Sequence, residues 1–169
     1  MPVEKKLTNE EAGKLRSEGG AFLKQGVTSS AEITEPVVLE FMAALEGREF
    51  IDFDELQQKK FMKFWPYIAI HRLEDDDFTY IFNGTHLVES FGFERTGLKV
   101  SELPNQRRKT ELFEILHDIL TNKKPIFGKG DLNIDGRAYK KWQQVKMPLR
   151  RKGEINEVLT LLVFDAKID

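Results

Sequence analysis

The chain has 169 residues, of which 40% are hydrophobic and 11% aromatic, so it can bury a sizeable core without disulfides or a structural metal. It contains no cysteine, which excludes disulfides, zinc–thiolate sites, iron–sulfur clusters and the cysteine photoadduct of a flavin photosensor. Acidic and basic residues nearly balance, for a formal net charge of -2, so we expect no nucleic-acid partner.

The sequence carries no targeting or membrane-spanning pattern. It has no run of about 18 apolar residues, the length that a transmembrane helix needs. The N-terminus, Met1 to Lys6, is not followed by the apolar stretch of a secretory signal. We therefore expect a cytoplasmic protein that does not contact membranes.

Residues 1–31 are polar and are interrupted by several glycines. Within them, Thr8 to Glu11 fits a capping box, which predicts a short helix to about Ser17. Few apolar residues are available to hold such a helix against a core. We interpret 1–31 as an N-terminal arm, either mobile or a helix that needs a partner, and 32–169 as a single domain.

The next helix is predicted to begin at Thr34-Glu35-Pro36, because proline is tolerated in a first turn, and to end at Gly47. Its apolar positions follow helical spacing and form a stripe that could make a dimer face; the candidates are Val37, Val38, Phe41 and Leu45. Residues 52–64 hold further helical turns, which Pro66 ends.

From Tyr67 the apolar pattern changes to a period of two. Residues 67–73 and 78–82 are predicted to be strands of one hairpin, with its turn at Asp75 to Asp77. Residues 83–107 are punctuated by glycines and predict short, irregular helices.

The clearest helical pattern lies at Lys109 to Asn122, where Leu112, Ile115, Leu116 and Ile119 occupy positions i, i+3, i+4 and i+7. Three strands follow, at 126–134, 137–149 and 155–164, and Asp135-Gly136 predicts a two-residue hairpin turn between the first two. This order indicates an α+β domain with five antiparallel strands. We expect the central helices on one sheet face and the N-terminal helix on the other.

The residues from the first strand onward carry a family resemblance. They are Ile70-His71-Arg72-Leu73, the segment from Asp77 to Thr85, Phe91-Gly92, Arg95-Thr96-Gly97-Leu98 and Ser101-Glu102-Leu103. With them the chain resembles the PAS-like family of small, often single-domain bacterial proteins found mainly in alphaproteobacteria, over residues 35–165. The resemblance implies a PAS-like five-stranded antiparallel sheet with central short helices, a connecting helix and an N-terminal flanking helix. It implies no general ligand or catalytic residue.

The resemblance favours a sensory protein. Because the domain uses most of the 169 residues, we expect it to act without an output domain of its own, through a small ligand or a partner protein. The first hypothesis is a ligand-gated sensor, and the alternative is a ligand-free dimerisation or interaction module, as a homodimer or with another protein. An enzyme is the least favoured, because no nucleophile, base and orienting group occur together.

PAS folds often hold a ligand between the sheet and the connecting helix, so aromatic and histidine side chains near that helix are candidates for the pocket. They are Phe82, His86, Phe91, Phe113, Leu116, His117, Phe127 and Trp142. The indole N–H of Trp142 needs a partner if it is buried, and the alternative is a place on a dimer face.

The three histidines leave the cofactor open. His117 borders the apolar stripe of its helix, and we favour a boundary residue over a haem ligand. His86 is expected to cap a backbone carbonyl or to contact a ligand, and His71 is expected on the surface. No pair of histidines has i, i+4 spacing, so no metal site is predicted.

Overall fold

The structure is a computed structural model that describes residues 26–92, 94–103, 106–132 and 140–165. The strands are β1 (Val27–Thr28), β2 (Ile51–Asp52), β3 (Ile68–Glu74), β4 (Asp77–Asn83), β5 (Ile126–Leu132), β6 (Lys140–Arg151) and β7 (Glu154–Asp165). The α-helices are α2 (Pro36–Ala44), α3 (Phe53–Leu56), α4 (Lys59–Met62), α5 (Thr85–Phe91) and α6 (Gln106–Asn122). Short 3-10 helices are η1 (Ser30–Glu32), η2 (Trp65–Tyr67) and η3 (Val100–Glu102).

The strands of the described residues form one seven-stranded sheet in the order β1-β5-β6-β7-β3-β4, with β2 paired to β6. All neighbours are antiparallel except β2 and β6, which are parallel. The α+β class and the five long antiparallel strands are confirmed. The strand count is wrong, because two-residue segments add β1 and β2, which are too short to show a periodic pattern. β1 lies within the predicted arm and pairs with β5.

The hairpin of β3 and β4 confirms the prediction from period two, with a tighter turn. Asp75 and Asp76 adopt positive φ angles of 50° and 62°, a region that aspartate tolerates better than most residues. Asp77 already belongs to β4 and pairs with Glu74. The predicted turn at Asp135-Gly136 and the predicted helix before Ser17 lie outside the described residues.

Helix α2 places its apolar stripe in the chain's own core. Val38, Phe41 and Leu45 are fully buried and Val37 is partly buried, in one cluster with the sheet. These four candidates for a dimer face are therefore not a free surface. Among the large apolar residues of α2, Leu39 is exposed, at 46%.

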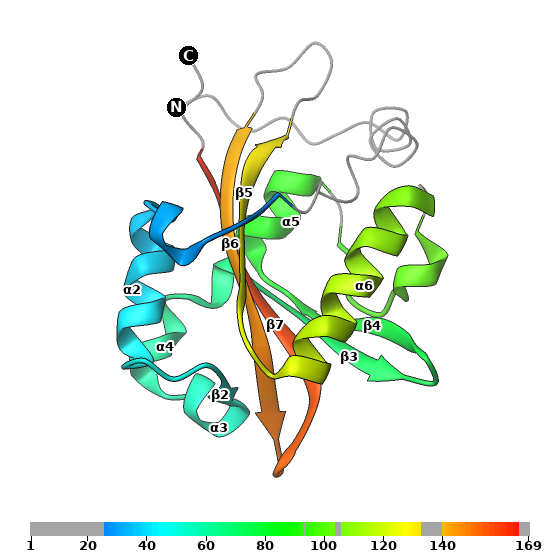
Figure 1. Cartoon of the computed structure of the whole chain (residues 1–169), viewed down its shortest axis with the longest axis horizontal. Helices are drawn as coiled ribbons and strands as arrows, with labels where there is room; N and C mark the ends of the chain where they lie inside the picture. The colour runs from blue at the N-terminus through cyan, green and yellow to red at the C-terminus, as the bar shows by residue number, and fades with distance from the viewer. Residues whose placement is uncertain (1–25, 93, 104–105, 133–139, 166–169) are drawn as a thin grey trace.

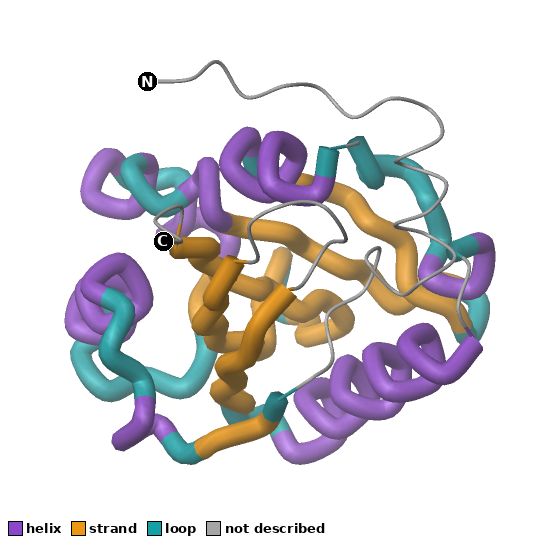
Figure 2. Tube along the Cα trace, turned by 90° about the horizontal axis from the view of Figure 1, so that it is seen from above, coloured by secondary structure: helices purple, strands orange, loops and turns teal. Residues whose placement is uncertain are grey.

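Helices cover both faces of the sheet, as predicted. In Figure 1 the sheet lies between α2, α3 and α4 on one side and α5 and α6 on the other, and Figure 2 shows the same layers from above. Alternation along β7 fills both layers: Leu159, Leu161 and Val163 pack with α2, whereas Val158 packs with α6. We call the two sides of the sheet the α2 face and the α6 face.

Candidate ligand-binding site

Polar side chains divide the α6 face into two apolar clusters. Along β7, Val158 belongs to the cluster that includes α6, Leu162 belongs to the cluster that includes α5, and Thr160 lies between them. Along β3, His71 lies between Ala69 of the α5 cluster and Leu73, which packs on the α6 cluster. The buried polar residues of this region are His71, Tyr80, Arg95, Lys146 and Thr160, which we call the polar belt.

Strand register sets the first part of the belt. Lys146 of β6 lies opposite Thr160 of β7, which lies opposite Ala69 of β3. Lys146 Nζ donates to Thr160 Oγ1 at 3.0 Å, and the two residues are 4% and 3% exposed. Ala69 is the smallest side chain of this row.

His71 is 2% exposed and lies in a strand with neighbours on both sides, β7 and β4. The exposure that we predicted for it is therefore wrong. Its ring contacts that of Tyr80, with ring centres 4.1 Å apart, and among the described residues neither ring nitrogen has a hydrogen-bond partner. Burial, followed by the charges of Lys146 and Arg95, lowers the pKa of His71 well below its usual value, so the ring is neutral.

Arg95 follows α5 and packs on Phe91 of that helix and on Tyr80 of β4. Its guanidinium carbon lies 3.8 Å from the ring centre of Phe91 and 5.8 Å from that of Tyr80, and the residue is 4% exposed. Both contacts suit a cation over an aromatic face. Burial raises the pKa of Tyr80, and the charge and hydrogen bond of Arg95 act in the opposite direction.

The belt concentrates positive charge in a buried layer. Burial, followed by the charge of Arg95, lowers the pKa of Lys146 to about 7. Within the described residues, no carboxylate is among the groups that shift the pKa of Lys146 or of His71. Burying the ammonium group of Lys146 costs free energy, because the hydrogen bond that the described residues give it goes to a neutral hydroxyl.

Comparisons with known proteins do not show a family for this chain. No family model matches the chain, and no curated protein matches it. Among solved structures, the PAS domain of BvgS from Bordetella pertussis is similar to this chain, with 21% sequence identity and a TM-score of 0.39. The similarity covers 75% of this chain and 84% of the BvgS domain chain. A TM-score of this size does not place the chain in the family of that domain.

The structure brings most of the predicted pocket residues to one side of the sheet. The α6 face or the helices on it carry His86, Phe91, Phe113, Leu116, His117 and Trp142. Phe82 and Phe127 instead pack against the cluster of the α2 face. The predicted set is therefore split between two layers. Phe127 pairs with Val145 of the α2-face cluster, and Phe82 lies beside the register shift between Ile70 and His71.

Two of the histidines make ordinary packing contacts. His86 Nε2 accepts the backbone N–H of Phe164 at 3.2 Å, and its ring packs on Tyr67. This nitrogen thus accepts from a backbone amide, whereas we expected His86 to cap a backbone carbonyl. His117 packs edge-on against Phe78 and on Phe113.

Trp142 is 2% exposed and lies across Gly130 of β5. A Cβ at position 130 would fall 2.7 Å from the indole ring, so this strand pairing needs glycine there. Among the described residues, the indole N–H has no hydrogen-bond partner. Like His71, Trp142 therefore presents a buried polar atom on the α6 face.

Sequence reasoning missed the belt itself. Trp142, Gln144 and Lys146 alternate with Val145 and Met147, and polar residues that alternate with apolar ones normally indicate a solvent-facing side. Here that side is covered by α5 and α6. Only the resemblance segment, which includes His71 and Arg95, drew attention to part of this region.

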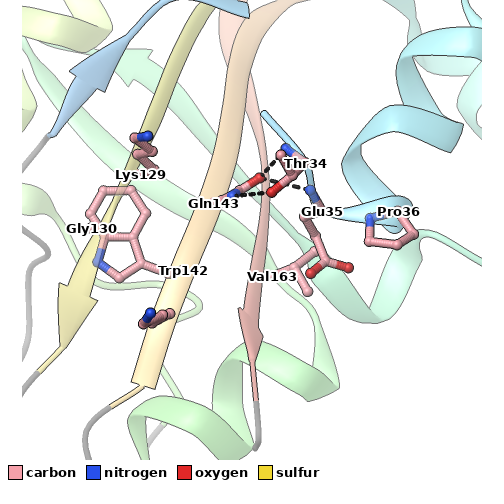
Figure 3. A pocket seen from close by; sticks show the side chains of 9 residues that line it. Thr34, Glu35, Pro36, Lys129, Gly130, Trp142, Gln143 and Val163 are labelled. Atoms are coloured by element: carbon pink, nitrogen blue, oxygen red, sulfur yellow. Dashed lines mark hydrogen bonds between the residues drawn. The ribbon is translucent and has the colours of Figure 1, made fainter. Parts of the chain in front are cut away.

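A pocket of 560 Å³ lies where the segment before α2 meets β5 and β6 (Figure 3). Gln143 spans it: its Oε1 accepts the backbone N–H groups of Thr34 and Glu35, each at 2.8 Å. Its Nε2 donates to Thr34 Oγ1 at 2.9 Å. One side chain of β6 thus holds the start of α2 on the sheet.

A second pocket, of 500 Å³, lies on the α2 face. Most of its lining side chains are apolar, and they include Phe53 and Phe82. Two arginines at its rim, Arg72 and Arg151, pair with Glu157, which is 1% exposed, at 3.2 and 2.8 Å. The buried carboxylate on this face is therefore paired with two arginines.

The described residues contain no group of three or more histidine or acidic side chains that could hold a metal ion. None of the described helices combines the length and the apolar character needed to cross a membrane.

Proposed function

We propose that this protein is a PAS-like sensory domain that binds a small molecule between the α6 face of its sheet and the helices α5 and α6. The polar belt carries this proposal. Burying polar groups costs free energy unless they are partnered, and proteins depart from an apolar core mainly at functional sites. The orphaned nitrogens of His71 and the indole N–H of Trp142 are groups that a ligand would satisfy. The PAS resemblance of residues 70–103 supports the same location.

Binding fits the belt better than turnover does. The five belt residues are 2–4% exposed, so a bound molecule is enclosed by protein on all sides. An enzyme at this position would need to open and close for each substrate. We therefore propose a non-catalytic role.

Helix α2 is the proposed route by which binding is signalled. Lys146 and Gln143 lie three residues apart on β6 and point to opposite faces of the sheet, one into the belt and one to the start of α2. A ligand that moves β6 would therefore alter the hydrogen bonds at Thr34 and Glu35. Strand β6 would then contact the ligand on one face of the sheet and the start of α2 on the other.

Native mass spectrometry tests the proposal on the purified full chain. We expect a species heavier than the 19.6 kDa chain, whose extra mass is released on denaturation. Hydrogen exchange should then show changed protection in β6 and α2 when the released compound is added back. If the protein is purely apo, and if no member of a metabolite library raises its Tm, the sensory proposal fails.

A further inference from the structure

The 500 Å³ pocket on the α2 face is lined by apolar side chains and by two arginines. Its apolar walls include Phe53 and Leu56 of α3, Trp65 of η2, and Ile81 and Phe82 of β4. The indole N–H of Trp65 donates to the carbonyl oxygen of Leu56 at 2.9 Å, so this polar atom is already satisfied. Three of these five side chains are aromatic, which favours a ligand with a flat, apolar skeleton.

The two arginines of this pocket share one carboxylate. Glu157 Oε2 accepts from Nε of Arg72 at 3.2 Å and from Nε of Arg151 at 2.8 Å. Glu157 itself is 1% exposed and does not line the pocket. It neutralises one of the two guanidinium charges, and none of the described side chains that line the pocket is acidic. The pocket therefore carries an excess of one positive charge.

Hydrogen-bond donors of both arginines remain available to a ligand. Among the residues that the structure describes, the Arg72 side chain donates through Nε, which leaves its two Nη groups. Arg151 gives Nε and Nη2 to Glu157, and its guanidinium carbon lies 3.6 Å from the ring centre of Phe53. The side chains of Arg72 and Arg151 are 33% and 25% exposed, so an anion can reach them from solvent. Planar guanidinium groups in this position suit a carboxylate.

We propose that this pocket is a second binding site, separate from the one on the α6 face, and that it takes a small aromatic carboxylate. The carboxylate pairs with the Nη groups of Arg72 and with Arg151. The ring of the ligand lies against Trp65 and Phe82, whose own rings are 6.4 Å apart in an edge-to-face contact. An inorganic anion would leave the apolar walls unused, and a neutral ring would leave the excess charge without a partner.

The test compares probes that differ either in charge or in the ring. Benzoate is titrated into the full-length protein beside benzamide, which is neutral, and acetate, which has no ring, at matched ionic strength. The readout is the NMR resonance of each indole N–H, because Trp65 lines this pocket and Trp142 lies on the α6 face. We expect benzoate to shift the resonance of Trp65 saturably and to leave that of Trp142 in place. Benzamide and acetate should bind at least roughly tenfold more weakly.

A charge variant and a matched control complete the test. Arg72→Gln should weaken benzoate binding by roughly tenfold or more, because it removes the available donors and the excess charge together. Arg151 still pairs with Glu157 in this variant, so we expect the fold to be kept. Arg107→Gln removes an equal charge from α6, where the side chain is 80% exposed, and should leave binding unchanged.

The outcomes separate this site from the proposed function. If benzoate leaves the Trp65 resonance in place, or if benzamide binds as tightly, the inference is overturned whether or not the variants fold. If benzoate shifts the resonance of Trp142 alone, the carboxylate binds on the α6 face, so the second site is refuted and the proposed function gains support. Equal weakening by Arg107→Gln would indicate a general attraction of anions and would overturn the inference as well.

Discussion

Lys146 on β6 and Thr160 on β7 face each other across neighbouring strands, and the lysine donates to the threonine hydroxyl at 3.0 Å under helices α5 and α6. A neutral hydroxyl satisfies one N–H but does not offset a charge. Burying the ammonium group beside this hydroxyl therefore costs stability. Natural proteins retain such costs mostly where function needs them.

Lys146→Met should stabilise the ligand-free domain. Methionine fills a similar volume without bringing a charge into the buried layer, and replacements of this kind are commonly neutral or stabilising by about 1–3 kcal/mol. The measurement is urea unfolding at pH 7 of ligand-free protein, with Lys141→Met as the control that should change little. Destabilisation by Lys146→Met would show that the lysine is a structural partner in the apo protein.

Stability should rise with pH above neutrality. The pKa of Lys146 is about 7 in the folded protein, whereas that of an ordinary, solvated lysine is 10.5. Between these two pH values the unfolded chain therefore binds more protons than the folded one. The free energy of unfolding therefore increases with pH in this window, by up to about 1.4 kcal/mol per unit, and the full penalty is present below pH 7. Unfolding curves across this range should lose that slope in Lys146→Met. Equal slopes in both proteins would contradict a depressed pKa.

His71 should add to the loss of stability in acid. Because its pKa in the folded protein lies well below 6.5, the unfolded chain takes up a proton first as the pH falls past that value. The free energy of unfolding therefore falls as the pH falls from this value to the depressed pKa of the folded state. An NMR titration of the imidazole should show a neutral ring throughout the range where the domain remains folded. Titration near 6.5 would mean that the ring is solvated.

Gln143→Ala should loosen the start of α2. The substitution removes two bonds to backbone amides and one to Thr34 Oγ1, which we expect to cost about 1–2 kcal/mol. Hydrogen exchange should become faster at residues 34–38 and stay unchanged in α6. The same exchange pattern in Lys141→Ala, the exposed neighbour on β6, would indicate a general weakening of the strand.

Gly84→Ala tests why the resemblance segment has a glycine before Thr85. A Cβ at position 84 would lie 2.3 Å from the carbonyl oxygen of Trp65 and 2.4 Å from that of Pro66, although the φ of −68° suits any residue. We expect a loss of about 2 kcal/mol, because the backbone must move to relieve the overlap. Thr85→Ala, at an exposed position, should change the free energy of unfolding by less than about 0.5 kcal/mol.

Glu157→Gln should destabilise the α2 face. The substitution leaves Arg72 and Arg151 without their carboxylate, and because both arginines are partly exposed we expect about 2–3 kcal/mol. Chemical unfolding gives the value, and Glu154→Gln, at the exposed first residue of β7, is the control. A change no larger than in that control would show that solvent compensates both arginines.

Local sequence patterns determined the elements of this fold. The spacing of Leu112, Leu116 and Ile119 predicted α6, the alternation after Tyr67 predicted the β3–β4 hairpin, and Pro36 marked the start of α2. Each of these signals depends on residues close together in the chain, where the period of the backbone alone decides which side chains share a face. The two-residue strands β1 and β2 carried no such signal, because their pairing depends on distant partners.

The candidate site was decided only by tertiary structure. His71, Arg95 and Lys146 come from three separate segments, and nothing local distinguishes a polar residue that faces solvent from one that faces a covered sheet. Strand order placed β3 and β6 on either side of β7, and helices α5 and α6 then buried the polar side of all three. Burial is a property of what packs on a face, so the sequence determined the periodicity and the packing of distant elements determined the charge-bearing site.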